Sequence, residues 1–237
     1  LSTETNIETL AINQKNIIKE CLKYSKPVIV ATEMLDNMIS NPYPTKAEVL
    51  DISNSVQEGT TATMLSGETA VGKYPVESIK VMRKIAKSSI SNVDLENKSN
   101  YPKILPTESF GMANAVKSLC TSLPISKIIS ITISGYSARI ISSQRLPQPI
   151  LAVCNNPDQA RSLNIYENTK GIYYNTKFFT SNLDHIPKCL KFLWKTKKIS
   201  SKDMIIVVAL VYPSGGRRMN LIQTHYVRDL VKTLSWK

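Results

Sequence analysis

The sequence lacks the clusters of cysteine and histidine that mark metal sites and disulfide frameworks. Its 237 residues include four cysteines and two histidines. Cys21, Cys120, Cys154 and Cys189 are widely spaced, so neither a zinc site nor a disulfide framework is indicated. Cys120 and Cys154 stand in apolar surroundings, and we expect buried free thiols there, which are typical of a reducing compartment.

Long hydrophobic runs are also absent. No apolar stretch reaches the about 20 residues that a membrane-spanning helix needs, so we predict no membrane partner. The chain opens in a polar segment, without Met or a signal-like start. We therefore expect a piece of a longer protein, whose targeting cannot be read from this end. Hydrophobic residues make up 42% of the sequence, which is enough for a folded core.

Acidic residues are scarce: 18 Asp and Glu stand against 30 Lys and Arg, for a net charge of +12. A basic protein invites a nucleic-acid interpretation. The lysines, however, are spread along the chain and are not interleaved with aromatic residues. The densest run, Lys188 to Lys202, is typical of a solvated helix face. We therefore expect no nucleic-acid partner and an attraction for phosphorylated metabolites, and an electrophoretic shift at physiological salt would test the nucleic-acid alternative.

Two short apolar runs each end in small hydroxyl, glycine and carboxylate residues. They are KPVIVATEML, from Lys26 to Leu35, and MLSGETA, from Met64 to Ala70. An apolar run of this length predicts a strand that is buried on both faces. A polar cluster just past the carboxyl end of a parallel strand is where α/β folds place their sites. The spacing of about one βα repeat predicts neighbouring strands of one barrel or sheet.

The first 90 residues alternate between helical and strand patterns. Thr45, followed three residues later by Glu48, predicts a capping box at the start of a helix that Gly59 ends. The expected elements are helices over 7–24, 35–39, 45–58 and 75–90 and strands over 28–31 and 61–65.

A polar, proline-marked stretch over residues 93–106 predicts a linker. After it we expect a helix over 108–120 that Thr107 caps, and further helices over 138–144, 157–163 and 183–196. The expected strands are 127–133, 149–153, 171–174, 204–211 and 220–227. This alternation predicts a second α/β domain with a mostly parallel sheet. The domain prediction is therefore 1–92, a linker over 93–106, and 107–237.

These motifs resemble pyruvate kinase. The segments 26–40, 44–48 and 64–75 are similar to the last two repeats of its catalytic barrel, and 132–138 and 156–161 are similar to its C-terminal domain. The resemblance covers about residues 1–227. It implies a partial TIM (β/α)8 barrel followed by a separate three-layer α/β domain that binds effectors.

The resemblance implies phosphoryl transfer from phosphoenolpyruvate to ADP, giving pyruvate and ATP in glycolysis, with Mg²⁺ and K⁺ as cofactors. It also implies a cytoplasmic homotetramer, with an organellar isoform as the alternative. The family's catalytic Lys, both metal-binding carboxylates and the first six barrel strands would precede Leu1. Because phosphoryl transfer depends on those charges, we expect no metal ligands in this chain and no activity from it alone.

The resemblance assigns a catalytic role to Thr32, whose hydroxyl would contact the substrate carboxylate near the proton delivered to the enolate. The alternative is a strand-end Thr that caps the next helix. Ser66, Gly67 and Glu68 would shape the floor of the site and the nucleotide pocket. Alternatively, Gly67 supplies a tight turn and Glu68 accepts backbone hydrogen bonds. Glu33 stands where the family usually has Gln.

A second predicted site is the effector loop: Thr132, Ser134, Gly135, Tyr136 and Ser137. A strand followed by these residues and a helix aims hydroxyls and backbone N–H groups at one point, which suits a phosphate. In the family, this loop holds one phosphate of a sugar-phosphate activator. An ordinary strand–helix turn is the alternative.

A second loop would cover the effector. Ser214, Gly215, Arg217 and Arg218 match it, and the two arginines would reach the effector's other phosphate. The alternative is a flexible basic hairpin. The family's Trp in this loop is not evident here, so the identity of the effector stays open.

The alternative function is a non-catalytic regulatory module that binds a sugar phosphate or a nucleotide. The sequence upstream of Leu1 discriminates between the two. The missing strands, ending in an Ala-Arg-Gly-Asp-type segment, would favour the enzyme, whereas a start codon at Leu1 would favour the module.

Overall fold

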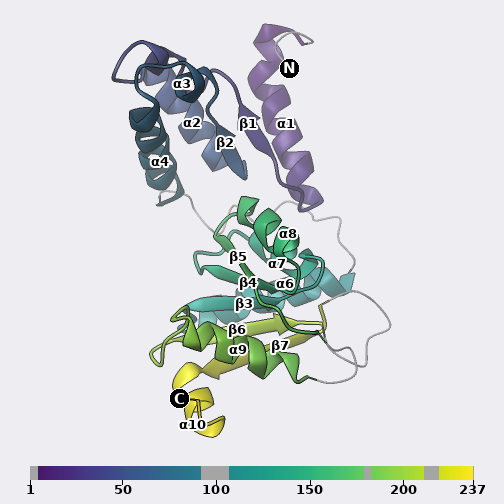
Figure 1. Cartoon of the computed structure of the whole chain (residues 1–237). Helices are drawn as coiled ribbons and strands as arrows, with labels where there is room; N and C mark the ends of the chain where they lie inside the picture. The colour runs from purple at the N-terminus through teal and green to yellow at the C-terminus, as the bar shows by residue number, and fades with distance from the viewer. Residues whose placement is uncertain (1–4, 92–106, 179–182, 211–218, 237) are drawn as a thin grey trace. The chain divides into compact units, whose positions relative to one another are not determined.

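The computed structural model describes residues 5–91, 107–178, 183–210 and 219–236. The chain divides into two compact units, Leu1–Ile104 and Leu105–Lys237 (Figure 1). The predicted linker over 93–106 lies outside the described residues. No helix in the described ranges is long and apolar enough to cross a membrane.

The first unit alternates between helices and two strands. Its elements are η1 (Ile7–Thr9), α1 (Leu10–Lys23), β1 (Ile29–Ala31), η2 (Asp36–Ile39), α2 (Lys46–Glu58), β2 (Ala62–Met64), α3 (Gly67–Ala70) and α4 (Pro75–Ser91). The two strands pair in parallel, with Val30 opposite Thr63. This pairing confirms the prediction that the two apolar runs form neighbouring strands. The short helix α3 has no counterpart in the sequence prediction.

The boundaries of α2 confirm the predicted capping signals. Thr45 Oγ1 accepts a hydrogen bond from the Glu48 backbone N–H at 3.2 Å, and Glu48 Oε2 accepts one from the Thr45 N–H at 2.6 Å. Gly59 ends the helix with a left-handed φ of 107°. Glycine adopts this conformation without a steric penalty from a Cβ atom.

The prediction that both strands are buried on two faces is wrong for this chain. Ile29 in β1 is 49% exposed and Met64 in β2 is 43% exposed. The core of the unit gathers instead around the segment after β1 and the inner sides of α2 and α4. The helices of this unit pack on that core and leave part of the sheet exposed. The core residues are Met34, Leu35, Met38, Ile52, Val56 and Met82.

The second unit contains a five-stranded sheet in the order β5-β4-β3-β6-β7. The strands are β3 (Lys127–Ile131), β4 (Ile150–Cys154), β5 (Thr169–Tyr173), β6 (Met204–Ala209) and β7 (Leu221–Tyr226). Every neighbouring pair is parallel except β6 with β7. The sheet is thus mostly parallel, as predicted.

Helices cover both faces of this sheet, which confirms the three-layer α/β arrangement (Figure 1). Leu193 of α9 packs in one core with Val207 of β6, and Val116 of α6 packs in the other with Ile206. Alternate residues of β6 therefore point to opposite faces, and both faces are buried. The last helix, α10, has no counterpart in the prediction. The helical elements are α6 (Thr107–Ser122), α7 (Tyr136–Ser142), α8 (Pro157–Ser162), η3 (Leu163–Ile165), α9 (His185–Lys195) and α10 (Val227–Thr233).

Helix α8 lies directly against strand β5 at Gly171. A Cβ atom at this position would overlap the carbonyl oxygen of Ala160. The Gly171 N–H donates a hydrogen bond to Asn164 Oδ1 at 3.0 Å, which ties β5 to η3 as well. The absence of a side chain at residue 171 therefore sets the distance between this helix and the sheet.

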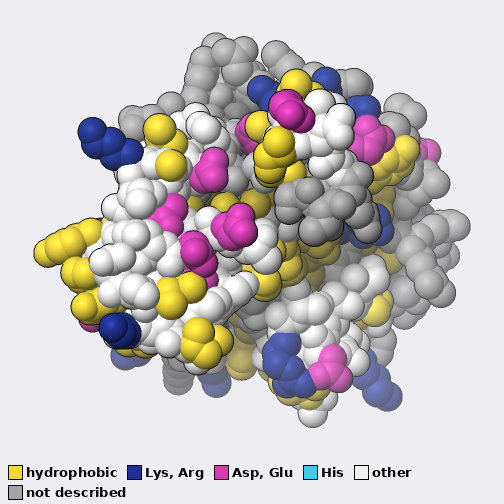
Figure 2. Space-filling model, turned by 90° about the horizontal axis from the view of Figure 1, so that it is seen from above, with side chains coloured by type: hydrophobic (Ala, Val, Ile, Leu, Met, Phe, Trp, Pro, Cys, Tyr) yellow, Lys and Arg dark blue, Asp and Glu magenta, His cyan; other side chains and the backbone are white. Residues whose placement is uncertain are grey.

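The basic charge of the chain is dispersed. On α9, Lys188, Lys191 and Lys195 are exposed while Cys189 and Leu193 are buried, which confirms the predicted solvated face. On the face drawn in Figure 2, lysine and arginine side chains are scattered and do not form one basic patch.

A partly buried ionic cluster joins the starts of β3 and β6. The Asp203 carboxylate accepts hydrogen bonds from Lys127 Nζ at 2.6 Å, the Ser200 N–H at 2.7 Å and Ser126 Oγ at 3.0 Å. Burial by itself would raise the pKa of Asp203. The hydrogen bonds from Lys127, Ser200 and Ser126 and the Lys127 charge outweigh it, so the pKa lies below its ordinary 3.8.

The ionic cluster predicts an acid-sensitive contribution to stability. Because folding lowers the pKa of Asp203, its contribution is present above pH 3.8 and is lost as the pH falls through the folded-state pKa. We expect Asp203→Asn to cost about 2 kcal/mol at neutral pH, since hydrogen bonds to a charged group are lost. Urea unfolding from about pH 6 to about pH 3 should show a shallower pH dependence for this variant. Asp158→Asn, at an exposed ion pair, is the control, and equal slopes for wild type and Asp203→Asn would contradict the assignment.

Candidate functional site

Thr32 stands immediately after β1 in an unusual backbone conformation. Its φ is 75° and that of Glu33 is 56°, and both side chains are exposed. A left-handed φ is an outlier for a β-branched residue and costs on the order of 1–3 kcal/mol. Such conformations persist where the surrounding structure holds them, and they concentrate at functional sites. The next two residues provide that hold, because Met34 is 5% exposed and Leu35 is fully buried.

Glu68 joins the two polar segments that follow β1 and β2. Its side chain is buried, with Oε1 accepting from the Leu35 N–H at 2.9 Å and Oε2 from the Ser66 N–H at 2.7 Å. One carboxylate thus fixes the loop after each strand. This is the alternative role given to Glu68 from the sequence, namely that its carboxylate accepts backbone hydrogen bonds. Through Leu35, the same carboxylate helps to position Thr32.

Ser66 and Gly67 form the turn that leads into α3. Ser66 is half-buried, and its carbonyl oxygen accepts a backbone hydrogen bond from Ala70 at 3.0 Å. A Cβ atom at Gly67 would stand 2.9 Å from Ile39 Cδ1, the end of a flexible side chain. The loop after β2 therefore packs against η2, which follows β1. The structure brings the two predicted segments together at the carboxyl ends of adjacent strands.

The effector loop after β3 divides into inward and outward side chains. Thr132 Oγ1 accepts from the Gly135 N–H at 3.0 Å, and Ser137 Oγ lies 2.9 Å from Ser130 Oγ. Thr132 and Ser137 are each 6% exposed, whereas Ser134 is exposed. The hydroxyls of Thr132 and Ser137 thus hold the loop's shape. Ser134 is free to face a ligand.

The remaining residues of the predicted effector site are Gly135, Tyr136 and those of the covering loop. Tyr136 donates its hydroxyl hydrogen to Ser109 Oγ at 3.0 Å, and Gly135 has a φ of 77°. The predicted covering loop with Ser214, Gly215, Arg217 and Arg218 lies outside the described residues.

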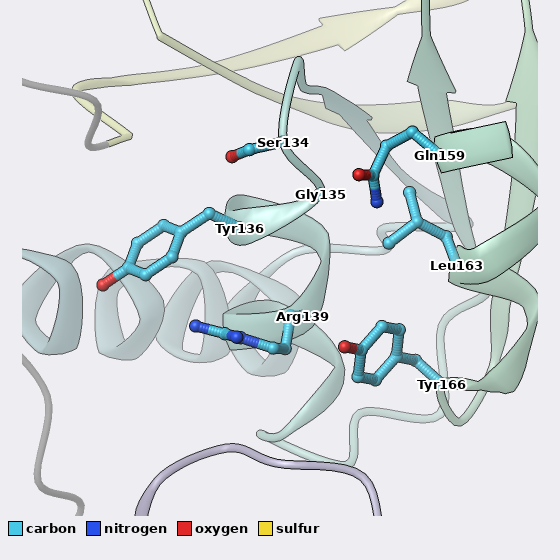
Figure 3. Close-up of a pocket in the computed structure, with 7 residues that line it drawn as sticks. All are labelled: Ser134, Gly135, Tyr136, Arg139, Gln159, Leu163 and Tyr166. Atoms are coloured by element: carbon cyan, nitrogen blue, oxygen red, sulfur yellow. The ribbon is translucent and has the colours of Figure 1, made fainter. Parts of the chain in front are cut away.

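A cavity of about 210 Å³ opens beside this loop (Figure 3). Four of its lining residues, Arg139, Gln159, Leu163 and Tyr166, are not among the site residues predicted from the sequence. The i, i+3 spacing of Tyr136 and Arg139 at the start of a helix is the signal that could have found one of them. The lining residues are Ser134, Gly135, Tyr136, Arg139, Gln159, Leu163 and Tyr166.

The cysteines are free thiols, and three of them are buried, as predicted for Cys120 and Cys154. Burial raises the pKa of Cys120 and Cys154 to about 11 and that of Cys189 to about 12. Thiols with such pKa values carry almost no thiolate at neutral pH. These three side chains therefore have packing roles.

A resident metal ion needs several ligand side chains gathered at one point. No group of three or more His, Cys, Asp or Glu side chains within the described ranges could hold a metal ion.

Loss of one of the two backbone hydrogen bonds that the Glu68 carboxylate accepts should lower the stability of the chain. In Glu68→Gln, one oxygen becomes an amide that cannot accept from a backbone N–H, so either Leu35 or Ser66 loses its partner. We expect a cost of about 1–3 kcal/mol in the free energy of unfolding. Glu33→Gln makes the same chemical change at an exposed position and should change stability by less than about 0.5 kcal/mol. Chemical denaturation of the 237-residue chain measures both, and similar effects for the two variants would refute this role of Glu68.

Comparison with known proteins gives a consistent result for both units. Residues 1–79 match the family model "Pyruvate kinase, barrel domain", and residues 111–225 match "Pyruvate kinase, alpha/beta domain". A pyruvate kinase of Bacillus licheniformis is 35% identical over 240 residues, and one of Geobacillus stearothermophilus is 32% identical over 236 residues. Each alignment covers 98% of this chain and 39% of the relative, so the chain spans about two fifths of these proteins.

A solved structure has the same fold. The crystal structure of a pyruvate kinase from Cryptosporidium parvum superposes with a TM-score of 0.80 at 30% sequence identity, covering 95% of this chain and 45% of that one. The Thr32 and Glu68 loops lie within the matched barrel segment, and the effector loop lies within the matched alpha/beta domain. From its strand-end loops to its five-stranded sheet, the chain belongs to the pyruvate kinase family, of which it carries part of the barrel and the alpha/beta domain.

Proposed function

We propose that this chain supplies one wall of the active site of a pyruvate kinase, which transfers the phosphoryl group of phosphoenolpyruvate to ADP to form pyruvate and ATP. The observation that carries the proposal is the pair of strand-end loops locked together by Glu68, with Thr32 held exposed beside them. A non-catalytic module that binds a sugar phosphate or nucleotide is less well supported, because the matched barrel segment belongs to the catalytic domain.

In this proposal Thr32 positions the substrate. Its hydroxyl orients the carboxylate of phosphoenolpyruvate and lies near the carbon that gains a proton when the enolate becomes pyruvate. Ser66, Gly67 and Glu68 form the floor beneath it, where Glu68 acts through backbone hydrogen bonds and touches no substrate. Positioning of this kind contributes to rate by reducing the entropy lost in reaching the transition state.

The remaining groups of the reaction would come from other parts of the protein. We propose Mg²⁺ and K⁺ as the cofactors, with ligands that this chain does not supply. A cytoplasmic homotetramer is part of the same proposal. The isolated chain is accordingly expected to show no turnover.

Thr32 can be tested in the full-length product of the gene. Removing the hydroxyl in Thr32→Ala should lower kcat by roughly 100-fold, the smaller end of the range for a group that assists proton transfer. Thr32→Ser retains the hydroxyl and should recover most of the turnover. Thr121→Ala, at an exposed helical position, serves as the control. A kcat close to wild type in Thr32→Ala would rule out the proposed role.

We also propose that the effector loop holds a phosphate of a sugar-phosphate activator. The exposed Ser134 hydroxyl supports this, while Thr132 and Ser137 stabilise the loop from inside. An added carboxylate in Ser134→Asp should repel the phosphate and abolish activation in the full-length enzyme, with basal turnover retained. Activation curves with fructose 1,6-bisphosphate and glucose 6-phosphate measure this effect, and Ser143→Asp offers a control at the other end of α7. An unchanged activation curve would remove the loop from consideration.

A further inference from the structure

His185 is the more deeply buried of the two histidines in the chain and has no role in the proposed function. It stands in the first turn of α9, on one face of the five-stranded sheet (Figure 1). The residue is only 2% exposed. Histidine changes its charge within the range of about pH 5 to 8, so a buried histidine can make the surrounding structure sensitive to pH.

The Nδ1 atom of His185 is buried and has no hydrogen-bond partner among the described residues. In a neutral imidazole ring one nitrogen carries a hydrogen and the other a lone pair, whereas in the protonated ring both nitrogens are donors. Protonation would therefore place a positive charge and a donor without an acceptor in the interior, and each of these is unfavourable. The contacts of Nδ1 thus favour the neutral ring.

The surroundings of the ring are apolar. The Phe178 ring lies 5.5 Å from the His185 imidazole, measured between centroids, at an interplanar angle of 33°. Phe178 also packs on the core that contains Ile186 and Cys189 of the same helix. Apolar side chains from β3, β4, β5, β6 and α10 complete this core. The sheet side of α9 therefore offers no group that could stabilise an imidazolium ion.

The charged groups near His185 belong to α9, its N-cap and the segment that carries Phe178. Burial lowers the pKa of His185 below its ordinary 6.5, and this effect exceeds that of the Asp184 carboxylate, which raises the pKa. The Lys188 charge lowers the pKa further. Lys177, beside Phe178, is exposed and also positive. The positive end of the α9 dipole likewise disfavours a cation in the first turn.

The first turn of α9 belongs to the core beneath the effector loop. Ile186 shares this core with Ile131, the last residue of β3, which directly precedes Thr132. We propose that His185 is a pH switch: the first turn of α9 stays packed while the ring is neutral, and protonation in mildly acidic solution releases it from Phe178 and the core. The switch needs no bound effector, so it does not depend on the proposed activation.

Histidine side-chain NMR of the unmodified 237-residue chain tests the switch directly. The two histidines give two Cε1–H signals, which the spectrum of His225→Gln assigns. Because the folded state disfavours the charged ring, we expect the His185 signal to titrate below pH 6.5. The stability that the neutral ring contributes is present above pH 6.5, and the folding equilibrium constant should fall by up to about tenfold per pH unit below it. Titration of His185 at pH 6.5 or above overturns the proposal.

Amide hydrogen exchange separates local release from unfolding of the whole domain. The N–H groups of Cys189 and Leu190 bond one turn back, to His185 and Ile186. After correction for intrinsic exchange rates, they should lose protection between about pH 7 and about pH 5.5 before the Val207 N–H in β6 does. Equal protection of α9 and β6 throughout this range would mean that the domain opens only as a whole, which contradicts the switch.

Two variants remove the titrating ring: His185→Gln leaves a neutral polar side chain, and His185→Phe keeps a ring against Phe178. Either variant should abolish the preferential loss of α9 protection in acid. Wild-type pH dependence in the folded variant would overturn the proposal, and if neither variant folds, the wild-type titration and exchange decide.

His225→Gln is the matched control, because burial also lowers the pKa of His225. This residue lies on β7, where its Nε2 is 3.3 Å from Gln223 Oε1. The His225→Gln variant should show the same exchange in α9 as the wild type. Loss of the α9 pH dependence in this variant would assign the effect to the wrong histidine and would overturn the proposal.

Discussion

A single buried carboxylate organises the first unit. Glu68 accepts one backbone N–H from the loop after each strand, so the two loops have a fixed relation although the strands themselves are short and partly exposed. The left-handed backbone at Thr32 and Glu33 leads into Met34 and Leu35, which are buried, and the Leu35 N–H is bonded to Glu68. In this unit the loops are therefore held by polar bonding at least as much as by burial of the sheet.

Much of the fold could be predicted from local sequence signals. The capping box at Thr45 and Glu48, the left-handed Gly59 and the apolar run of β6 depend on neighbours in the sequence, and the structure confirms each of them. The exposure of β1 and β2 could not be predicted, because a pattern of apolar residues reports what a strand can bury and says nothing of what covers it. The helix α10 follows β7 without a clear break in composition.

The candidate sites were predictable to different extents. Motif residues such as Thr32 and Ser134 can be proposed from the sequence because they lie in the short segments that follow predicted strands. Arg139 lies on α7, Gln159 on α8 and Tyr166 directly after η3, and only the tertiary fold brings them together. The inward orientation of Thr132 and Ser137 also depends on tertiary contacts, since Ser137 bonds to a serine within β3.

Gly171 has a consequence for evolution and engineering of the cavity beside the effector loop. The residue lies on β5 and lines no part of the cavity, yet the contact with Ala160 determines how closely α8 approaches the sheet. Any side chain at residue 171 would push α8, and Gln159 with it, away from β5. The shape of the cavity therefore depends on a residue that does not line it, and a library that diversifies the lining residues should keep this glycine constant.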